Sequence, residues 1–232
     1  MKGNSLVLLA AAGASVLVLS GCSRSLGGDV AATVDGTTIT NADVSFLAKM
    51  QCDAINEAVK DPAQSGNVQA VSRKQLRADM LNALVQAQLD SDLAKKQHVS
   101  YDRATYRQVM DQFEQAVQAA PKKDRSRFRD LVGSLYQGKL EAYAIAAEQL
   151  TAQGVSQPSQ QQVESVVASL ERGLLLKADI HIDPVYGADA QGLAGGGDAS
   201  LSKPISSFAK ASTASPEDAS FVSGLPPYQR CG

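Results

Sequence analysis

Apolar residues recur at three- and four-residue spacing in five successive stretches of this sequence, and this pattern restricts the fold more than any other feature. The spacing is that of one face of an α-helix. Capping signals at Thr40–Asp43, Ser72–Gln75 and Ser159–Gln162 open the first, second and fifth stretches. The third stretch begins near Asp102, and Pro121 opens the fourth. We therefore expect a mainly α domain with about five amphipathic helices.

Strand signals lie at both ends of this helical region. The segment Val30–Thr40 is rich in β-branched residues on both sides of Asp35-Gly36, a dipeptide typical of a two-residue hairpin turn. Over residues 176–183 the spacing changes to two, because Ala178, Ile180 and Ile182 alternate with polar residues. The two signals predict a small sheet, formed by an N-terminal hairpin and a strand near residues 176–183.

The two ends of the chain differ in composition from this region. More than half of residues 184–232 are Gly, Ala, Ser or Pro, with few large apolar side chains. Such a segment buries too little surface to offset its ordering entropy, so we expect a largely disordered tail. Residues 22–29 are polar and contain glycine, as expected of a short tether. The folded domain should therefore comprise residues 30–183.

The N-terminus has the organisation of a secretory signal. Lys2 precedes an apolar segment from Leu6 to Leu19, which ends in Leu19-Ser20-Gly21-Cys22. This ending resembles the lipobox of bacterial lipoproteins, which implies removal of residues 1–21 and lipidation of Cys22. Two other interpretations are an ordinary signal peptide with a chance cysteine and an uncleaved anchor helix. The resemblance implies a protein anchored by lipid to the extracytoplasmic face of a cell membrane.

Charge and motifs exclude several classes of function. The 22 Lys and Arg against 24 Asp and Glu give a net charge of −2, which is not the basic excess of a nucleic-acid-binding protein. No hydrolase or phosphate-binding motif is present, so we expect no catalytic residue and no cofactor. Asp179, His181 and Asp183 alternate on one predicted strand. Three ligands from one strand converge poorly on an ion, so we interpret them as a solvated face and expect no metal.

The hairpin region resembles the start of SurA-like and PrsA-like foldases. The resemblance rests on Val34-Asp35-Gly36-Thr37-Thr38-Ile39-Thr40 followed by Asp43, and the order of elements extends it to residues 30–182. It implies a chaperone domain that binds unfolded or secreted polypeptides. Many family members also carry a parvulin-type isomerase domain before the last strand. Only a short connection joins Leu170 to Ala178 here, so we expect no isomerase activity.

Flexible and aromatic side chains are the candidates for contact with a client polypeptide, since methionine adapts to varied shapes. An alternative is that each of them belongs to the core. A rival function is that of a structural or adaptor lipoprotein that docks one folded partner in an envelope assembly. The candidate residues are Met50, Met80, Met110, Phe113, Tyr136 and Tyr143.

Two cysteines remain if Cys22 is lipidated. Cys52 lies in the first predicted helix, and Cys231 is the penultimate residue. A compartment outside the cytoplasm permits disulfides, so we expect these two residues to pair. The alternative is a buried free thiol at Cys52 and an unrelated thiol at the C-terminus.

Overall fold

The computed structural model describes residues 28–62, 66, 68–187, 193–195, 206–207, 210 and 218–232. The proposed signal peptide, Cys22 and most of the tether lie outside these residues. Long helices form most of the described chain, and short strands and single 3₁₀ turns connect them. In chain order the elements are β1 (Val30–Val34), β2 (Thr37–Thr40), α1 (Asn41–Lys60), β3 (Val71–Ser72), α2 (Arg73–Gln97), α3 (Arg103–Ala119), η2 (Lys122–Asp124), α4 (Arg125–Ala152), α5 (Gln160–Leu175), β4 (Ile180–Ile182), η3 (Pro184–Tyr186), α7 (Ala219–Ser223), η4 (Pro227–Gln229) and β5 (Arg230–Cys231).

The three-stranded sheet joins the two ends of the helical region. Asp35 and Gly36 both have positive φ, 46° and 85°, as a type I′ turn requires between strands paired Val34 to Thr37. β1 is the central strand, and it pairs antiparallel with β2 on one side and β4 on the other. The prediction of a mainly α fold with a small sheet made by the hairpin and the strand near residues 176–183 is confirmed.

Local side-chain chemistry sets where the helices begin. Thr40 accepts a hydrogen bond from the backbone N–H of Asp43 at the start of α1, and Ser72 does the same for Gln75 in α2. Ser159 caps α5 in a complete capping box. Each cap satisfies backbone donors that a helix leaves free in its first turn. Pro121 precedes the 3₁₀ turn η2, and α4 follows that turn directly.

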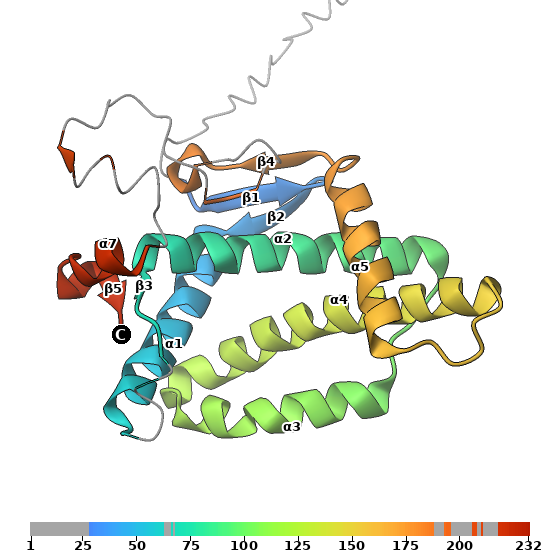
Figure 1. Cartoon of the computed structure of the whole chain (residues 1–232), viewed down its shortest axis with the longest axis horizontal. Helices are drawn as coiled ribbons and strands as arrows, with labels where there is room; N and C mark the ends of the chain where they lie inside the picture. The colour runs from blue at the N-terminus through green and yellow to red at the C-terminus, as the bar shows by residue number, and fades with distance from the viewer. Residues whose placement is uncertain are drawn as a thin grey trace, which may run out of the picture.

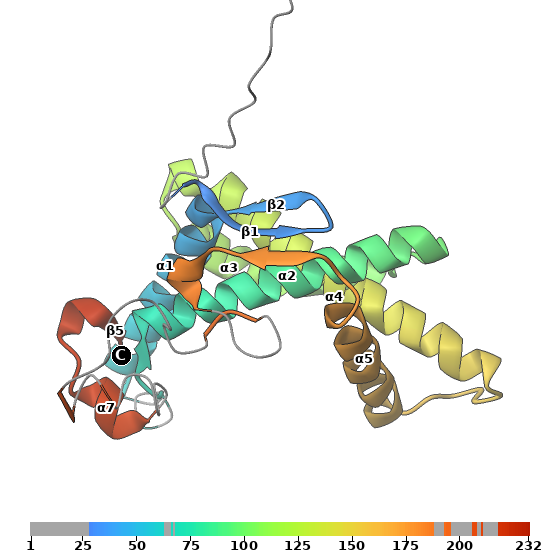
Figure 2. The ribbon, with the colours of Figure 1, turned by 90° about the horizontal axis from the view of Figure 1, so that it is seen from above.

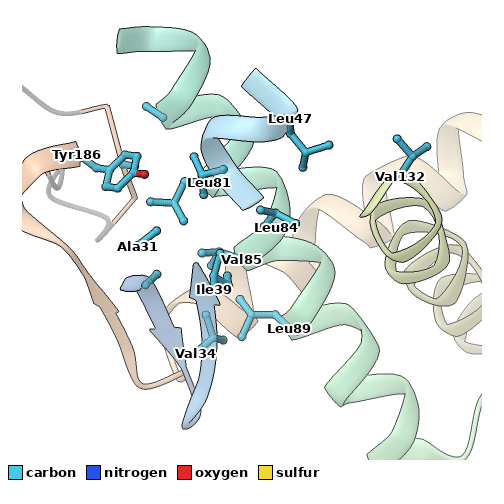
Figure 3. Close-up of a cluster of buried hydrophobic side chains, with 14 of the residues drawn as sticks. Ala31, Val34, Ile39, Leu47, Leu81, Leu84, Val85, Leu89, Val132 and Tyr186 are labelled. Carbon is cyan, nitrogen blue, oxygen red and sulfur yellow. The ribbon is translucent and has the colours of Figure 1, made fainter. Parts of the chain in front are cut away.

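Helix α2 lies at the centre of the fold. Figure 1 shows the sheet on one side of α2 and helices α3 and α4 on the other, and Figure 2 shows the sheet from above. The side chains of Leu81, Val85 and Leu89 from α2 meet Val34 and its neighbours beneath the sheet (Figure 3). These four side chains are almost fully buried. Burial of apolar side chains on both faces of α2 therefore holds the two layers together.

The last fifteen residues differ from the expectation of a largely disordered tail. α7 and β5 are folded, and Val222, Leu225 and Cys231 are buried. β5 pairs antiparallel with β3, and a disulfide joins Cys231 to Cys52 of α1 with their Cα atoms 5.2 Å apart. Composition alone underestimates the order of this segment. Its few apolar side chains bury little surface, but the disulfide ties it to α1. Most of the preceding segment, residues 188–217, lies outside the described residues.

Candidate polypeptide-binding groove

Residues of α2, α4 and α5 line a groove. These three helices come together at the end of the molecule away from the C-terminus (Figure 1). The volume of the groove is about 570 Å³. The C-terminal parts of α2 and α4, the middle and end of α5, and the segment after α5 contribute to it. The lining residues are Leu93, Gln97, Gln149, Gln153, Ser165, Val166, Ser169, Leu170, Gly173, Leu174 and Lys177.

A close backbone contact sets the position of α4 against α2. A Cβ atom added at Gly138 of α4 would lie 2.5 Å from the carbonyl oxygen of Ala87 in α2 and 2.7 Å from its Cα. Only glycine permits this approach, because any side chain would meet backbone that cannot move aside. Beyond this crossing point, the C-terminal halves of the two helices form two walls of the groove.

Helix α5 forms the third wall through a small apolar cluster of its own. Val167 of α5 is buried against Ala142 and Ala146 of α4. The small alanine side chains allow α5 to lie close to α4. Val166 and Leu170 pack at the margin of this cluster and also line the groove. The same face of α5 therefore both holds the helix in place and supplies apolar surface to the groove.

The groove combines apolar surface with neutral polar groups. Leu93, Val166, Leu170 and Leu174 supply the apolar part, and glutamine and serine side chains supply the polar part. Lys177 is the single charged residue among its lining. Amide and hydroxyl groups both donate and accept hydrogen bonds. Such a surface suits a polypeptide segment, whose apolar side chains and backbone amides both need partners.

Buried carboxyl groups lie where α2 and α4 pack together. Asp90 is 3% exposed and accepts a hydrogen bond from Gln86, while Glu141 is 7% exposed and accepts from Ser91 and Gln137. Burial raises the pKa of Asp90 to about 7; the Gln86 hydrogen bond opposes this rise, and the charges of Glu171 and Glu141 add to it. Neither Asp90 nor Glu141 forms a salt bridge with a described basic residue.

Glu171 of α5 adds a third acid at the same junction. Burial raises its pKa, and the positive charge of Lys139 opposes the rise. Each of α2, α4 and α5 thus contributes one acidic side chain to this junction, where the charges of Glu141 and Glu171 act on Asp90.

The six residues that the sequence suggested for client contact lie elsewhere. Five of them pack against the main core at partial exposure: Met50, Met80, Met110, Phe113 and Tyr136. Tyr143 packs instead in the α4–α5 cluster, beside Val166 and Leu170. None of the six lines the groove. All six side chains thus make hydrophobic contacts inside the domain while staying partly exposed, and their contact with a client stays a prediction.

The groove-lining residues were missed because they come from three separate helices. The four-residue spacing of Val166 and Leu170 indicates only that they share one face of a helix. One signal was present in the sequence, since serines and glutamines lie close to apolar residues on α5 and at the end of α4. A fully buried helix face would carry fewer such groups.

A second, smaller hollow of about 180 Å³ lies between β2, α2 and α4, beside Thr38, Gln88 and Ser134.

In the part of the chain that the structure describes, no three His, Cys, Asp or Glu side chains are grouped so that they could hold a metal ion. No described helix is both long enough and apolar enough to span a membrane.

Comparison with known proteins identifies the family. A family model described as the SurA-like N-terminal domain matches residues 2–156, about two thirds of the chain. This range includes β1 to α4, whereas α5 and β4 lie beyond it. No curated protein and no solved structure matches the chain significantly. With the hairpin, the helical layers and this match in agreement, the chain belongs to the family of proteins with a SurA-like N-terminal domain.

Proposed function

We propose that this protein is an extracytoplasmic chaperone that holds unfolded or translocated polypeptides in the α2–α4–α5 groove, without isomerising proline bonds. The family is chaperone-like, and the match covers its non-catalytic chaperone domain. The observation that carries the proposal is the composition of the groove, which combines leucine and valine side chains with neutral amides and hydroxyls.

The shape of the groove fits loosely held clients. A volume of about 570 Å³ accommodates a few side chains of an extended segment and not a folded domain. Gln97, Gln153, Ser165 and Ser169 are exposed and free to adjust to different backbones. A chaperone needs this adaptability, because its clients share no sequence.

We further propose that the protein is anchored at Cys22 on the extracytoplasmic face of a cell membrane. The Leu-Ser-Gly-Cys sequence supports lipidation. The Cys52–Cys231 disulfide independently supports an oxidising compartment, since such bonds are rare in the cytosol. A short segment, residues 23–29, would then separate the anchor from β1 and keep the groove near the membrane surface.

A charge placed in the groove tests the binding site. Ser169→Glu puts a carboxylate on the groove wall, and it should weaken suppression of the aggregation of chemically denatured proteins, because a client would have to desolvate that charge. The matched control is Ala168→Glu. Ala168 is also exposed on α5 but does not line the groove, so this variant should retain the activity of the unmodified protein.

Light scattering of at least three unrelated denatured proteins provides the measurement. Equal activity of the two variants would place client binding outside the groove. If the unmodified protein leaves all the denatured proteins to aggregate yet binds one folded envelope protein tightly, the chaperone proposal is wrong and the adaptor function takes its place. If the protein accelerated cis–trans exchange in a proline peptide, it would have isomerase activity, and that part of the proposal would be wrong.

The anchor has its own test. Cys22→Ala should either release the protein from the membrane fraction or leave an uncleaved precursor of higher mass. Fractionation and mass spectrometry of the mature chain distinguish these results. Normal processing and full membrane retention of the variant would contradict lipidation at Cys22.

A further inference from the structure

Strand β4 has one edge that pairs with no other described strand. In the order β2–β1–β4 it pairs with β1 on one side only. Its partners in β1 are Ala32 for Ile182, Thr33 for His181 and Val34 for Ile180. No other strand in the described part of the chain pairs with it.

The hydrogen-bond pattern shows which backbone groups face outward. The N–H of Asp183 donates to the carbonyl of Ala31, and the N–H of Asp35 donates to the carbonyl of Asp179. Hydrogen-bonded pairs alternate along an antiparallel ladder, so the next such pair is His181 with Thr33. The N–H and C=O groups of Ile180 and Ile182 therefore point away from β1. Within the described chain these four groups have no hydrogen-bonding partner.

In the sequence, β4 lies close to residues that line the groove. Gly173, Leu174 and Lys177 line the groove, and β4 begins three residues after Lys177. Two of the most exposed large apolar side chains flank the strand: Leu176 is 81% exposed and Val185 is 60% exposed. Exposed apolar side chains thus lie on both sides of β4 in the sequence, and the one before it is next to the groove-lining Lys177.

We propose that the outer edge of β4 takes up an extended segment of a client polypeptide as an added strand, so that the client's backbone is held at β4 while neighbouring side chains enter the groove. This inference rests on the proposed function and adds the mode of recognition. Strand addition draws its affinity from main-chain hydrogen bonds, which every sequence can form.

The chemistry of the edge favours an extended chain as the occupant. Two donors and two acceptors in alternation match another extended backbone, whereas a helix has already paired its own groups within its interior. Ile180 and Ile182 are half-buried beneath the sheet, so their side chains leave the edge itself accessible. The exposed side chains of Asp179 and His181 lie on the solvent-facing side, where Nδ1 of His181 is 3.3 Å from a carboxylate oxygen of Asp179.

Amide hydrogen exchange of the full mature chain tests the inference directly. The probe is reduced and carboxymethylated α-lactalbumin, an unfolded polypeptide, and its binding is first measured by titration. At saturating probe, exchange of the Ile180 and Ile182 amides should slow by roughly tenfold or more, while the His181 amide, already bonded to β1, should change little. Binding of the probe without this protection would overturn strand addition and leave the groove proposal standing.

Two further outcomes also overturn the inference. Protection of Ile180 and Ile182 that rises with protein concentration in the absence of probe would mean that a second copy occupies the edge. Failure of the probe to bind at all would remove the proposed function together with this mode of recognition.

A pair of variants provides a second test. Ile182→Pro removes the outward N–H of residue 182 without removing a bond to β1, and proline is tolerated on edge strands. Ile182→Ala loses the same side chain but keeps that N–H. One hydrogen bond corresponds to a roughly 2- to 10-fold weaker Kd for the proline variant than for the alanine variant. Equal affinity of the two variants, with equal melting temperatures, would contradict the inference.

Discussion

At the scale of single residues, Asp90 is a buried carboxyl group whose ionisation is costly. Burial raises its pKa to about 7, so the native state keeps a proton that the unfolded chain loses near pH 4. The stability that this proton confers is complete below about pH 4 and is lost as the pH rises to about 7. Asp90→Asn should therefore raise the free energy of unfolding at pH 8 by on the order of 2 kcal/mol and change it little at pH 3.5. Urea unfolding at both pH values measures this difference.

Asp43 provides a control of opposite sign. Burial acts to raise its pKa, but hydrogen bonds from Thr40 and Arg127, and the charge of Arg127, outweigh burial and lower it. Its contribution is present above about pH 4 and is lost as the pH falls further. Asp43→Asn should thus destabilise the protein at pH 7 more than at pH 3. If both variants changed stability equally at every pH, ionisation would not be the cause.

At the scale of elements, the sequence predicted what local chemistry determines. The Asp35-Gly36 turn and the caps at Thr40, Ser72 and Ser159 depend on neighbouring residues, and the structure has all of them. The groove could not be predicted, because its shape depends on where three helices cross. The pairing of β3 with β5 was also beyond reach, since strands of two residues have no periodicity.

The crossing of α2 and α4 gives an element-scale prediction from two glycines. Gly138→Ala should destabilise the fold by roughly 1–3 kcal/mol, because the added methyl group meets the backbone of Ala87. Gly173→Ala is the matched change in α5, where a Cβ atom meets nothing within 4 Å. This variant should have a free energy of unfolding about 0.5–1 kcal/mol higher, because alanine loses less conformational entropy than glycine in a helix. Thermal unfolding of both variants checks the two signs, and the same sign for both would contradict the close contact at Gly138.

At the scale of the whole molecule, the disulfide and the groove lie at opposite ends. The Cys52–Cys231 bond, β3 and β5 gather at the α1 end, whereas α5 and the groove lie at the other end of α2 (Figure 1). The N-terminal hairpin (β1 and β2) and β4 form the three-stranded sheet, which packs along α2. This separation predicts that the disulfide affects stability without affecting client binding.

The last prediction follows from the length of the loop that this bond closes. Cys52 and Cys231 are 179 residues apart, so the chain-entropy model gives a stabilisation of about 5 kcal/mol at most. Cys231→Ser should lower the midpoint of urea unfolding, and reductant should lower that of the unmodified protein to the same value while leaving the variant unchanged. Under conditions where the variant is still folded, it should suppress aggregation as well as the unmodified protein does.

Two outcomes would contradict this prediction. If the unmodified mature protein, unfolded without reductant, has two reactive thiols, the bond is absent. Loss of client binding in the folded variant would show instead that the segment from α7 to β5 takes part in recognition.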